Sequence, residues 1–379
     1  MLKVLANIEE LKKGLSQTSS IANRYTSMPI MANVLLEGAA GRLTLTATDL
    51  EITFQCSYDA DVLDEGSLTV PAKILSDIVS SLRGTVVFLE EKENLILNIE
   101  CDNFSTDIFG MSPEEFPRPA DTGAITFTDF PGGDLVDSIT KTNYSVATGN
   151  TNYNLAGVFW VKEPVGDHEV LKLVSTDNNR LNIATLATDN LEAFLLDEGI
   201  LVSRKSLTEL KSLAEKNDRV SLGVNANNLV ARTPNSIMIM RLLNGKFPMY
   251  QSLIPKEEGY IINLDRKEFS DTLKRISLLS SDKYRVVYFK VNEDSLVLYS
   301  RNSDVGEAQE KIIISHQGPF IHVGFDPKCL LEPLGTLKSE KVKLSIINSS
   351  RPAVITGEAD PGYMGIVSII TPREDDETS

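Results

Sequence analysis

Two aspartates are the best candidates for acid–base chemistry, because each follows a threonine, as Thr48-Asp49 and Thr176-Asp177. Paired carboxylates can act as general acid and general base when the fold brings their side chains together. These two pairs occupy corresponding positions in repeated segments, so the carboxylates would lie a domain apart. We therefore interpret Asp49 and Asp177 as turn residues that accept backbone hydrogen bonds, with a catalytic dyad as the alternative.

The three histidines lack the spacing that a metal site requires. His168 lies in a charged turn, His316 in a loop and His322 in an alternating strand, and no HExxH pair occurs. The sequence also lacks the GxSxG, GxGxxG and GxxxxGK[ST] patterns. We therefore expect a protein that is not an enzyme and that binds no metal and no other cofactor.

The distribution of charge limits the class of partner. The formal net charge is −16 and the sequence pI is about 4.8, which argues against a generally basic nucleic-acid binder but allows a local basic face. Residues 37–65 contain seven acidic residues and one basic residue, whereas 203–216 and 266–275 each contain four basic and two acidic residues. Helices with such composition could line a surface that binds phosphates. The alternative is ordinary solvated helix faces.

The elements that would position these charges recur along the chain. Three kinds of segment repeat in the same order, at a domain-sized period of roughly 130 residues. The corresponding residues are Leu15, Ile139 and Leu273 in an early amphipathic helix, Asp49, Asp177 and Asn302 in a strand, and Lys73, Lys205 and Lys328 at the start of a second helix.

The repeats predict three similar domains, at 1–122, 123–255 and 256–379, the last with an acidic C-terminal tail. Between the helices, apolar and polar residues alternate as they do in half-buried antiparallel strands. The predicted fold class is α+β, with two helices packed on antiparallel sheets in each domain.

The cysteine pattern and the lack of targeting and membrane-spanning segments indicate the cellular compartment. The three cysteines, Cys56, Cys101 and Cys329, form no CxxC pair, and an odd number fits a reducing compartment. The N-terminus has no signal-peptide core, and no apolar run approaches the roughly 18 residues of a membrane span. We expect a soluble cytoplasmic protein.

Four short motifs occur in the order and at the spacing of a known family. They are "MPIMANVLL", "TATDLEI", "STDNNRLNIA" and "GKFPMYQSLIP". With the triplicated domains, the acidic body and the basic helices, they make the chain resemble the bacterial DNA polymerase III beta subunit family, the replicative sliding clamps. The resemblance runs from the N-terminus to about Arg373.

The resemblance implies the DNA clamp fold, with two copies joined head to tail in a ring around double-stranded DNA. Such a ring confers processivity without sequence-specific contacts. It also docks partners, namely the polymerase III catalytic subunit, the clamp loader and other proteins with a clamp-binding motif, in a peptide cleft. A non-ring interaction scaffold without a DNA role is the alternative function.

The resemblance also implies roles for particular residues. The implied DNA-binding residues are Arg24, Tyr153, Lys205, Tyr284 and Arg285, and we add Lys73 because it lies near the start of one of the repeated helices. The implied cleft residues are Leu155, Thr176, Asn179, Leu181, Pro248, Leu253, Ile369, Ile370 and Pro372. The implied dimer contacts are Phe104 and Thr106 against Leu278 and Leu279, for which ordinary helix core is the alternative.

The sequence departs from the family pattern at the cleft. The chain reads Thr371-Pro372-Arg373 where the family commonly has an apolar-Met-Pro-Met-Arg-like end, and an acidic segment follows. Asn179 stands where the family often has a bulkier residue. We therefore leave the peptide preference open.

Overall fold

The computed structural model describes residues 1–22, 28–119, 123–147, 153–186, 188, 191–194, 196, 198–225, 227–257, 259–280, 285–302 and 304–372. The chain divides into two compact units. Unit 1 comprises Met1–Val136, Thr188–Asp197 and Lys205–Leu243, and unit 2 comprises Asp137–Ala187, Glu198–Arg204 and Asn244–Ser379.

The elements follow one another in a fixed order. The first series is β1 (Lys3–Asn7), α1 (Ile8–Ile21), β2 (Asn33–Ala39), β3 (Arg42–Thr48), β4 (Ile52–Asp64), β5 (Gly66–Pro71), α2 (Ala72–Ser81), β6 (Val86–Lys92), β7 (Ile96–Cys101) and β8 (Phe104–Phe109). The second is β9 (Thr128–Pro131), α3 (Gly132–Thr142), β10 (Gly157–Val165), β11 (His168–Thr176), β12 (Arg180–Leu186), β13 (Ile200–Ser203), α4 (Arg204–Ala214), β14 (Arg219–Asn225), β15 (Asn228–Thr233) and β16 (Ser236–Arg241). The third is β17 (Tyr260–Asp265), α5 (Arg266–Ser277), β18 (Val287–Val291), β19 (Ser295–Asn302), β20 (Gly306–Ile313), β21 (Ile321–Phe325), α6 (Pro327–Thr336), β22 (Lys341–Ile346), β23 (Ala353–Gly357) and β24 (Tyr363–Val367).

Each series has one strand, a helix, four strands, a second helix and three strands, so the predicted repetition is present in the structure. The predicted boundaries at 122 and 255 stay predictions. One expectation was wrong in detail: the repeated segments that contain Asp49, Asp177 and Asn302 are hairpins rather than single strands, namely β3–β4, β11–β12 and β19–β20. Apolar and polar residues alternate on both sides of a tight turn, so the sequence pattern does not show where one strand ends and the next begins.

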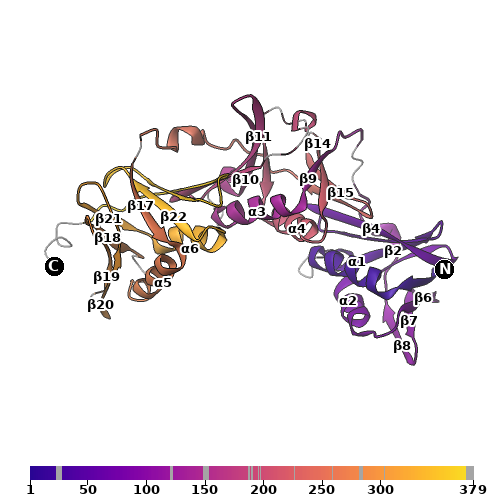
Figure 1. Cartoon of the computed structure of the whole chain (residues 1–379). Helices are drawn as coiled ribbons and strands as arrows, with labels where there is room; N and C mark the ends of the chain where they lie inside the picture. Colours follow the sequence, from indigo (N-terminus) through magenta and orange to yellow (C-terminus); the bar gives the residue numbers. More distant parts are fainter. Residues whose placement is uncertain are drawn as a thin grey trace. The chain divides into compact units, whose positions relative to one another are not determined.

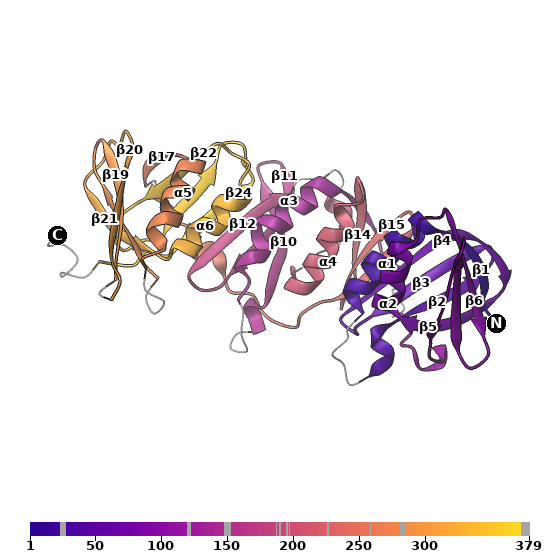
Figure 2. The ribbon, with the colours of Figure 1, turned by 90° about the horizontal axis from the view of Figure 1, so that it is seen from below.

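Unit 1 contains one sheet, which crosses from the first series of elements into the second. β8, β7, β6, β1 and β4 are consecutive neighbours, β4 then pairs with β16, and β15, β14 and β9 follow. α1 packs against α2, β3 and β4, and the two helices lie side by side on one face of this sheet in both views (Figures 1 and 2).

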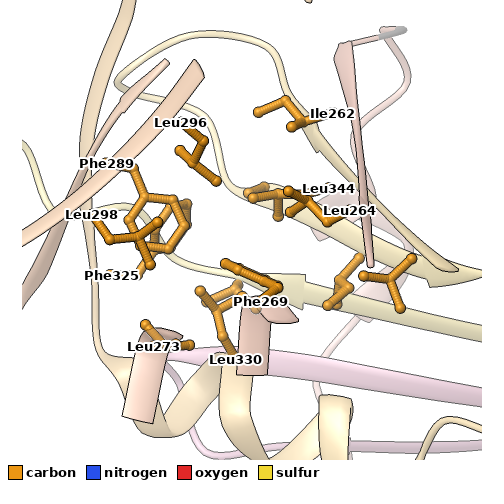
Figure 3. Close-up of a cluster of buried hydrophobic side chains, with 14 of the residues drawn as sticks. Ile262, Leu264, Phe269, Leu273, Phe289, Leu296, Leu298, Phe325, Leu330 and Leu344 are labelled. Atoms are coloured by element: carbon orange, nitrogen blue, oxygen red, sulfur yellow. The ribbon is translucent and has the colours of Figure 1, made fainter. Parts of the chain in front are cut away.

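Unit 2 contains an eight-stranded sheet and a four-stranded sheet. The larger has the order β13-β10-β11-β12-β24-β23-β22-β17, and the smaller has the order β20-β19-β18-β21. α5 and α6 pack against each other, and their buried side chains join the strands in one core. Figure 3 shows Phe269 and Leu330 from these helices close to Phe289 and Phe325 from the small sheet.

Local sequence explains where the helices begin. Asn7 and Asp265 cap α1 and α5, accepting hydrogen bonds from the backbone N–H groups of Glu9 and Glu268. The corresponding residues Leu15, Ile139 and Leu273 are fully buried, which confirms the predicted apolar faces. The three repeated lysines each occupy the second residue of α2, α4 and α6.

In the part of the chain that the structure describes, no helix is both long and apolar enough to cross a bilayer.

Candidate functional site

The Thr-Asp turns are structural. The Oδ1 atom of Asp49 accepts hydrogen bonds from the backbone N–H groups of Glu51 and Ile52, at 3.0 and 2.8 Å. Asp177 accepts one in the same way from Asn179, at 3.1 Å. This confirms the predicted turn role. The described residues also contain no group of three or more metal-ligating side chains that could hold an ion.

Lys205, an expected DNA-binding residue, forms ion pairs with the same turn. Its ammonium group contacts Oδ2 of Asp49 and lies 3.9 Å from a Glu51 carboxylate oxygen. The Asp49 side chain is 2% exposed, whereas the Lys205 side chain is 46% exposed. Lys205 therefore neutralises a buried carboxylate within unit 1, and its exposed part can still reach solvent.

The other expected DNA-binding residues are distributed over the chain. Lys73 is half-exposed and pairs with Asp77, one helical turn further along α2, at 2.7 Å. Arg285 is exposed two residues before the start of β18, and Tyr153 begins a short 3-10 helix, Tyr153–Leu155. Arg24 and Tyr284 lie outside the described residues.

Many cations on the helices are compensated by carboxylates. The pairs include Lys211 with Glu215, Lys267 with Asp271, Lys274 with Asp271 and Arg275 with Glu310. Exposed pairs of this kind contribute little to stability and exchange readily with other ions. The expected basic lining is therefore a surface of paired charges in these helices, which would make each phosphate contact weak.

Several expected cleft residues meet where β12 pairs with β24. Thr176 lies opposite Leu181 across the β11–β12 hairpin, and Leu181 lies opposite Ile366 on β24. The backbone carbonyl of Asn179 accepts a hydrogen bond from the Ser368 N–H at 2.9 Å. Leu181 is buried and Asn179 is exposed, so a polar side chain lies at the surface next to buried apolar residues.

The connector after β16 supplies a second group of cleft residues. Pro248 is exposed and Leu253 is 50% exposed. Between them Tyr250 is buried in one apolar cluster with Leu181, and its hydroxyl donates a hydrogen bond to Glu163. Burial opposes ionisation of Glu163, but hydrogen bonds from Lys172, Tyr250 and Gln251 hold its pKa below the ordinary value.

The C-terminal end of the described chain is held by one backbone bridge. The N–H and C=O groups of Ile370 each hydrogen-bond Gly324, at 2.8 Å. Ile369 packs against the core of the third series of elements, and Pro372 is half-buried. Leu155, by contrast, is 4% exposed, and its carbonyl accepts a hydrogen bond from the N–H group of Ala147.

Sequence reasoning missed two residues beside this group. Met249 is 84% exposed next to Pro248, and Phe247 stacks on Phe159 with ring centroids 5.0 Å apart. The signal was the "GKFPMY" connector, whose aromatic residues anchor the chain and leave the intervening residues at the surface.

The expected dimer contacts lie on or near unpaired sheet edges. Phe104 on β8 is 42% exposed and Thr106 is half-buried. Leu278 is 81% exposed, so the helix-core alternative is wrong for it, whereas Leu279 is half-buried. Among the described strands, β8 and β20 each have a neighbour on one side only. Unpaired edges carrying apolar residues favour pairing with another chain.

Comparison with known proteins gives a consistent result. Models of the DNA polymerase III beta subunit match its N-terminal domain at residues 2–120, its central domain at 130–249 and its C-terminal domain at 251–368. The beta sliding clamp of Haemophilus influenzae is 28% identical over 353 residues, which cover 92% of this chain and 93% of that protein. The clamp of Caulobacter vibrioides is 25% identical over 366 residues, covering 95% and 97%.

The similarity in sequence is accompanied by a similarity in fold to a solved structure. Caulobacter crescentus pol III beta superposes with a TM-score of 0.90 at 25% identity, covering 98% of this chain and 100% of that one. The expected clamp fold, with repeated domains of two helices on antiparallel sheets, is therefore confirmed.

Proposed function

We propose that this chain, which belongs to the DNA polymerase III beta subunit family, closes head to tail with a second copy into a ring around duplex DNA. Family membership makes it a sliding clamp, an accessory replication factor rather than an enzyme. It also favours the clamp over the scaffold without a DNA role. The ring would act in the cytoplasm, where bacterial DNA is copied.

The main support for the ring is that each of two sheets continues from one series of elements into the next. β4 of the first series pairs with β16 of the second, and β12 of the second pairs with β24 of the third. The strand of the third series that corresponds to β4 and β12 is β20, and the strand of the first that corresponds to β16 and β24 is β8. Pairing of β20 with β8 of a second copy would repeat the contact and close the assembly.

Weak phosphate contacts suit such a ring. A closed ring retains DNA by topology, so strong contacts would only hinder sliding. Lys73, Lys205 and Arg285 would contribute exchangeable contacts, because the two lysines already share their charge with Asp77 and Asp49. Arg24, Tyr153 and Tyr284 are proposed for the same surface on the resemblance alone.

Retention on circular and linear DNA tests this function. The protein is loaded by its clamp loader onto nicked circular DNA, and half of the sample is then linearised. We expect retention on the circle in high salt and release from the cut ends. Salt-sensitive loss from both forms would contradict the ring, because phosphate binding without topology weakens with salt.

The apolar surface at the junction of β12 and β24, together with the connector after β16, is the proposed docking site for partner proteins. Leu181 and Tyr250 give it a packed floor, and Leu253 and Ile370 are partly exposed above it. A peptide with apolar anchors fits this composition.

We expect Leu253→Lys to weaken binding of the polymerase III catalytic subunit at least tenfold, measured by surface plasmon resonance. Val165→Lys is the matched control, because Val165 is 53% exposed in the same unit at the β10–β11 turn. Equal loss of binding in both variants would argue against docking at this surface.

A further inference from the structure

The two strand junctions within the chain have one register. Each pairs five residues in antiparallel fashion. The pairs are Ile52↔Met240, Thr53↔Ile239, Phe54↔Met238, Gln55↔Ile237 and Cys56↔Ser236 in one, and Arg180↔Val367, Leu181↔Ile366, Asn182↔Gly365, Ile183↔Met364 and Ala184↔Tyr363 in the other.

The hydrogen bonds that flank the junctions also correspond. In unit 1 they run from the Ser57 N–H to the Asn235 carbonyl and from the Arg241 N–H to the Glu51 carbonyl, at 2.9 and 2.8 Å. In unit 2 they run from Thr185 to Gly362 and from Ser368 to Asn179, at 2.7 and 2.9 Å. The two junctions therefore keep the same register although the side chains at equivalent positions differ.

Hairpin pairing identifies the corresponding positions on the free edge of β20. Thr48 lies opposite Thr53 in the first hairpin, and Thr176 lies opposite Leu181 in the second. Thr53 and Leu181 occupy equivalent positions in the two junctions. In the third hairpin the partner of Arg301 is Glu307. Arg301 directly precedes Asn302, as Thr48 and Thr176 precede their aspartates, so Glu307 corresponds to Thr53 and Leu181.

Hairpin pairing also identifies the equivalent positions on the free edge of β8. The hairpins β7–β8 and β15–β16 both close with two-residue turns, through Cys101↔Phe104 and Thr233↔Ser236. Phe104 thus corresponds to Ser236. Three residues further along, Asp107 corresponds to Ile239, the partner of Thr53.

We infer that β20 pairs with β8 of the second copy in this shared register, so that Glu307 faces Asp107 of the second copy and the two carboxylates weaken ring closure. The inference rests on the proposed function, because it takes a second copy as the occupant of both edges. The neighbouring pairs would be Gly306↔Ile108, Ala308↔Thr106, Gln309↔Ser105 and Glu310↔Phe104.

Exposed apolar residues at the ends of this register support it. In this register, Phe109 would lie opposite Val305 of the other copy. This pair would be equivalent to Arg241 opposite Glu51 and Ser368 opposite Asn179. Phe109 is 80% exposed and Val305 is 67% exposed. Each would gain an apolar neighbour, whereas a slip of one residue would turn every side chain to the other face of the sheet.

The facing carboxylates distinguish this junction from the other two, where Thr53 faces Ile239 and Leu181 faces Ile366. Like charges directly opposite each other destabilise an antiparallel pair. Hydrogen bonds from Asn98 and Lys92 hold the pKa of Asp107 below its ordinary value, so this carboxylate is ionised at neutral pH. Lys92, whose ammonium lies 3.2 Å from Asp107, offsets part of the repulsion.

The test is the dimer dissociation constant of Glu307→Lys, measured by analytical ultracentrifugation of the full chain at low salt. Reversing this charge is worth about threefold at each junction, and the ring closes two junctions at once. We expect the dimer Kd to fall about tenfold, with an intermediate fall for Glu307→Gln. Glu293→Lys is the control, because Glu293 is exposed in the β18–β19 turn and changes the net charge equally.

The outcomes separate this inference from the proposed function. An unchanged Kd in Glu307→Lys, with dimers still formed, would overturn the register and leave the ring standing. A full effect of Glu307→Lys in an Asp107→Asn background would overturn the pairing of these two residues. A chain that stays monomeric under all conditions would overturn the ring and this inference together.

Discussion

The junction of β4 with β16 in unit 1 and the junction of β12 with β24 in unit 2 share a register and differ in chemistry. The first is apolar at its centre, where Phe54 faces Met238 and Ile52 faces Met240, all at most 3% exposed. At the positions of Phe54 and Met238, the second junction has Asn182 facing Gly365.

In the polar junction, a buried network surrounds the side-chain oxygen of Asn182 and the guanidinium group of Arg180. The hydroxyl groups of Tyr144 and Tyr363 donate hydrogen bonds to Oδ1 of Asn182, at 2.9 and 2.6 Å. Arg180 pairs with Asp177 at 2.9 Å, contacts Glu332 on α6 and stacks over the Tyr144 ring. Hydrogen bonds and ion pairs offset the cost of burying these polar groups. The two junctions therefore show that one register accommodates either apolar or polar side chains.

The largest expected effect is a cavity in the apolar junction. Phe54→Ala removes a side chain that is 3% exposed, which should cost about 4 kcal/mol of unfolding free energy. Urea unfolding followed by circular dichroism measures it. Leu63→Ala on the same strand is the control, since Leu63 is 59% exposed. A loss below about 1 kcal/mol for Phe54→Ala would mean that the junction is not tightly packed.

The polar junction should be nearly as sensitive to the loss of its cation. Arg180→Ala leaves Asp177 and Glu332 without their partner, at an expected cost of about 3 kcal/mol. Arg42→Ala removes an exposed pair with Asp59 and should cost at most about 1 kcal/mol. If the two variants unfolded at the same urea concentration, the buried network would contribute nothing beyond a surface pair.

The free energy of unfolding should depend on pH through a carboxyl group in unit 2. Burial opposes ionisation of Asp360, but hydrogen bonds from Lys141 and Ser339 lower its pKa from 3.8 to about 2. A depressed carboxyl pKa stabilises the fold above the unfolded value, so this stability is lost as pH falls from about 4 to 2.

The loss should amount to about 2 kcal/mol, measured as the difference in unfolding free energy between pH 5 and pH 2. Asp360→Asn should lack this part of the dependence, whereas Asp59→Asn, which alters an exposed carboxyl, should keep it. Identical pH profiles for wild type and Asp360→Asn would contradict the role of Asp360.

The smallest effects are expected from the lysines proposed to face DNA. Lys205→Ala should cost about 1 kcal/mol or less, because the Lys205 side chain is 46% exposed, unlike that of Arg180, so water can replace its ammonium group beside Asp49, which keeps its backbone hydrogen bonds. Lys73→Ala should cost less still. Retention on circular DNA should change by less than about twofold in either variant. A large loss from one lysine alone would indicate a specific contact and would contradict collective, exchangeable binding.

Local patterns predicted the elements better than their partners. The buried positions Leu15, Ile139 and Leu273 and the three helix-opening lysines follow from helical periodicity within a short stretch. Pairing of β4 with β16 joins segments far apart in sequence, and no local pattern encodes it. For the same reason, the contact of Lys205 with Asp49 was not predicted, although both residues had been singled out.

The most direct test of the shared register is a disulfide between copies. Ala308→Cys and Thr106→Cys in one chain would place the new thiols opposite each other across β20 and β8. Opposed residues in antiparallel strands lie about 4.5–5.5 Å apart at Cα, within disulfide range. The native thiols are buried, and burial raises the pKa of Cys56 and Cys329 to about 12, which keeps them unreactive.

Ala308→Cys with Phe104→Cys is the shifted control, because diagonal residues lie about 7–8 Å apart. Oxidation should convert the 308/106 variant into a covalent dimer that stays on circular DNA after denaturant is added, and the 308/104 variant should cross-link poorly. Efficient cross-linking of the shifted pair alone, or of neither pair in a dimeric protein, would contradict a single register for all junctions of the ring.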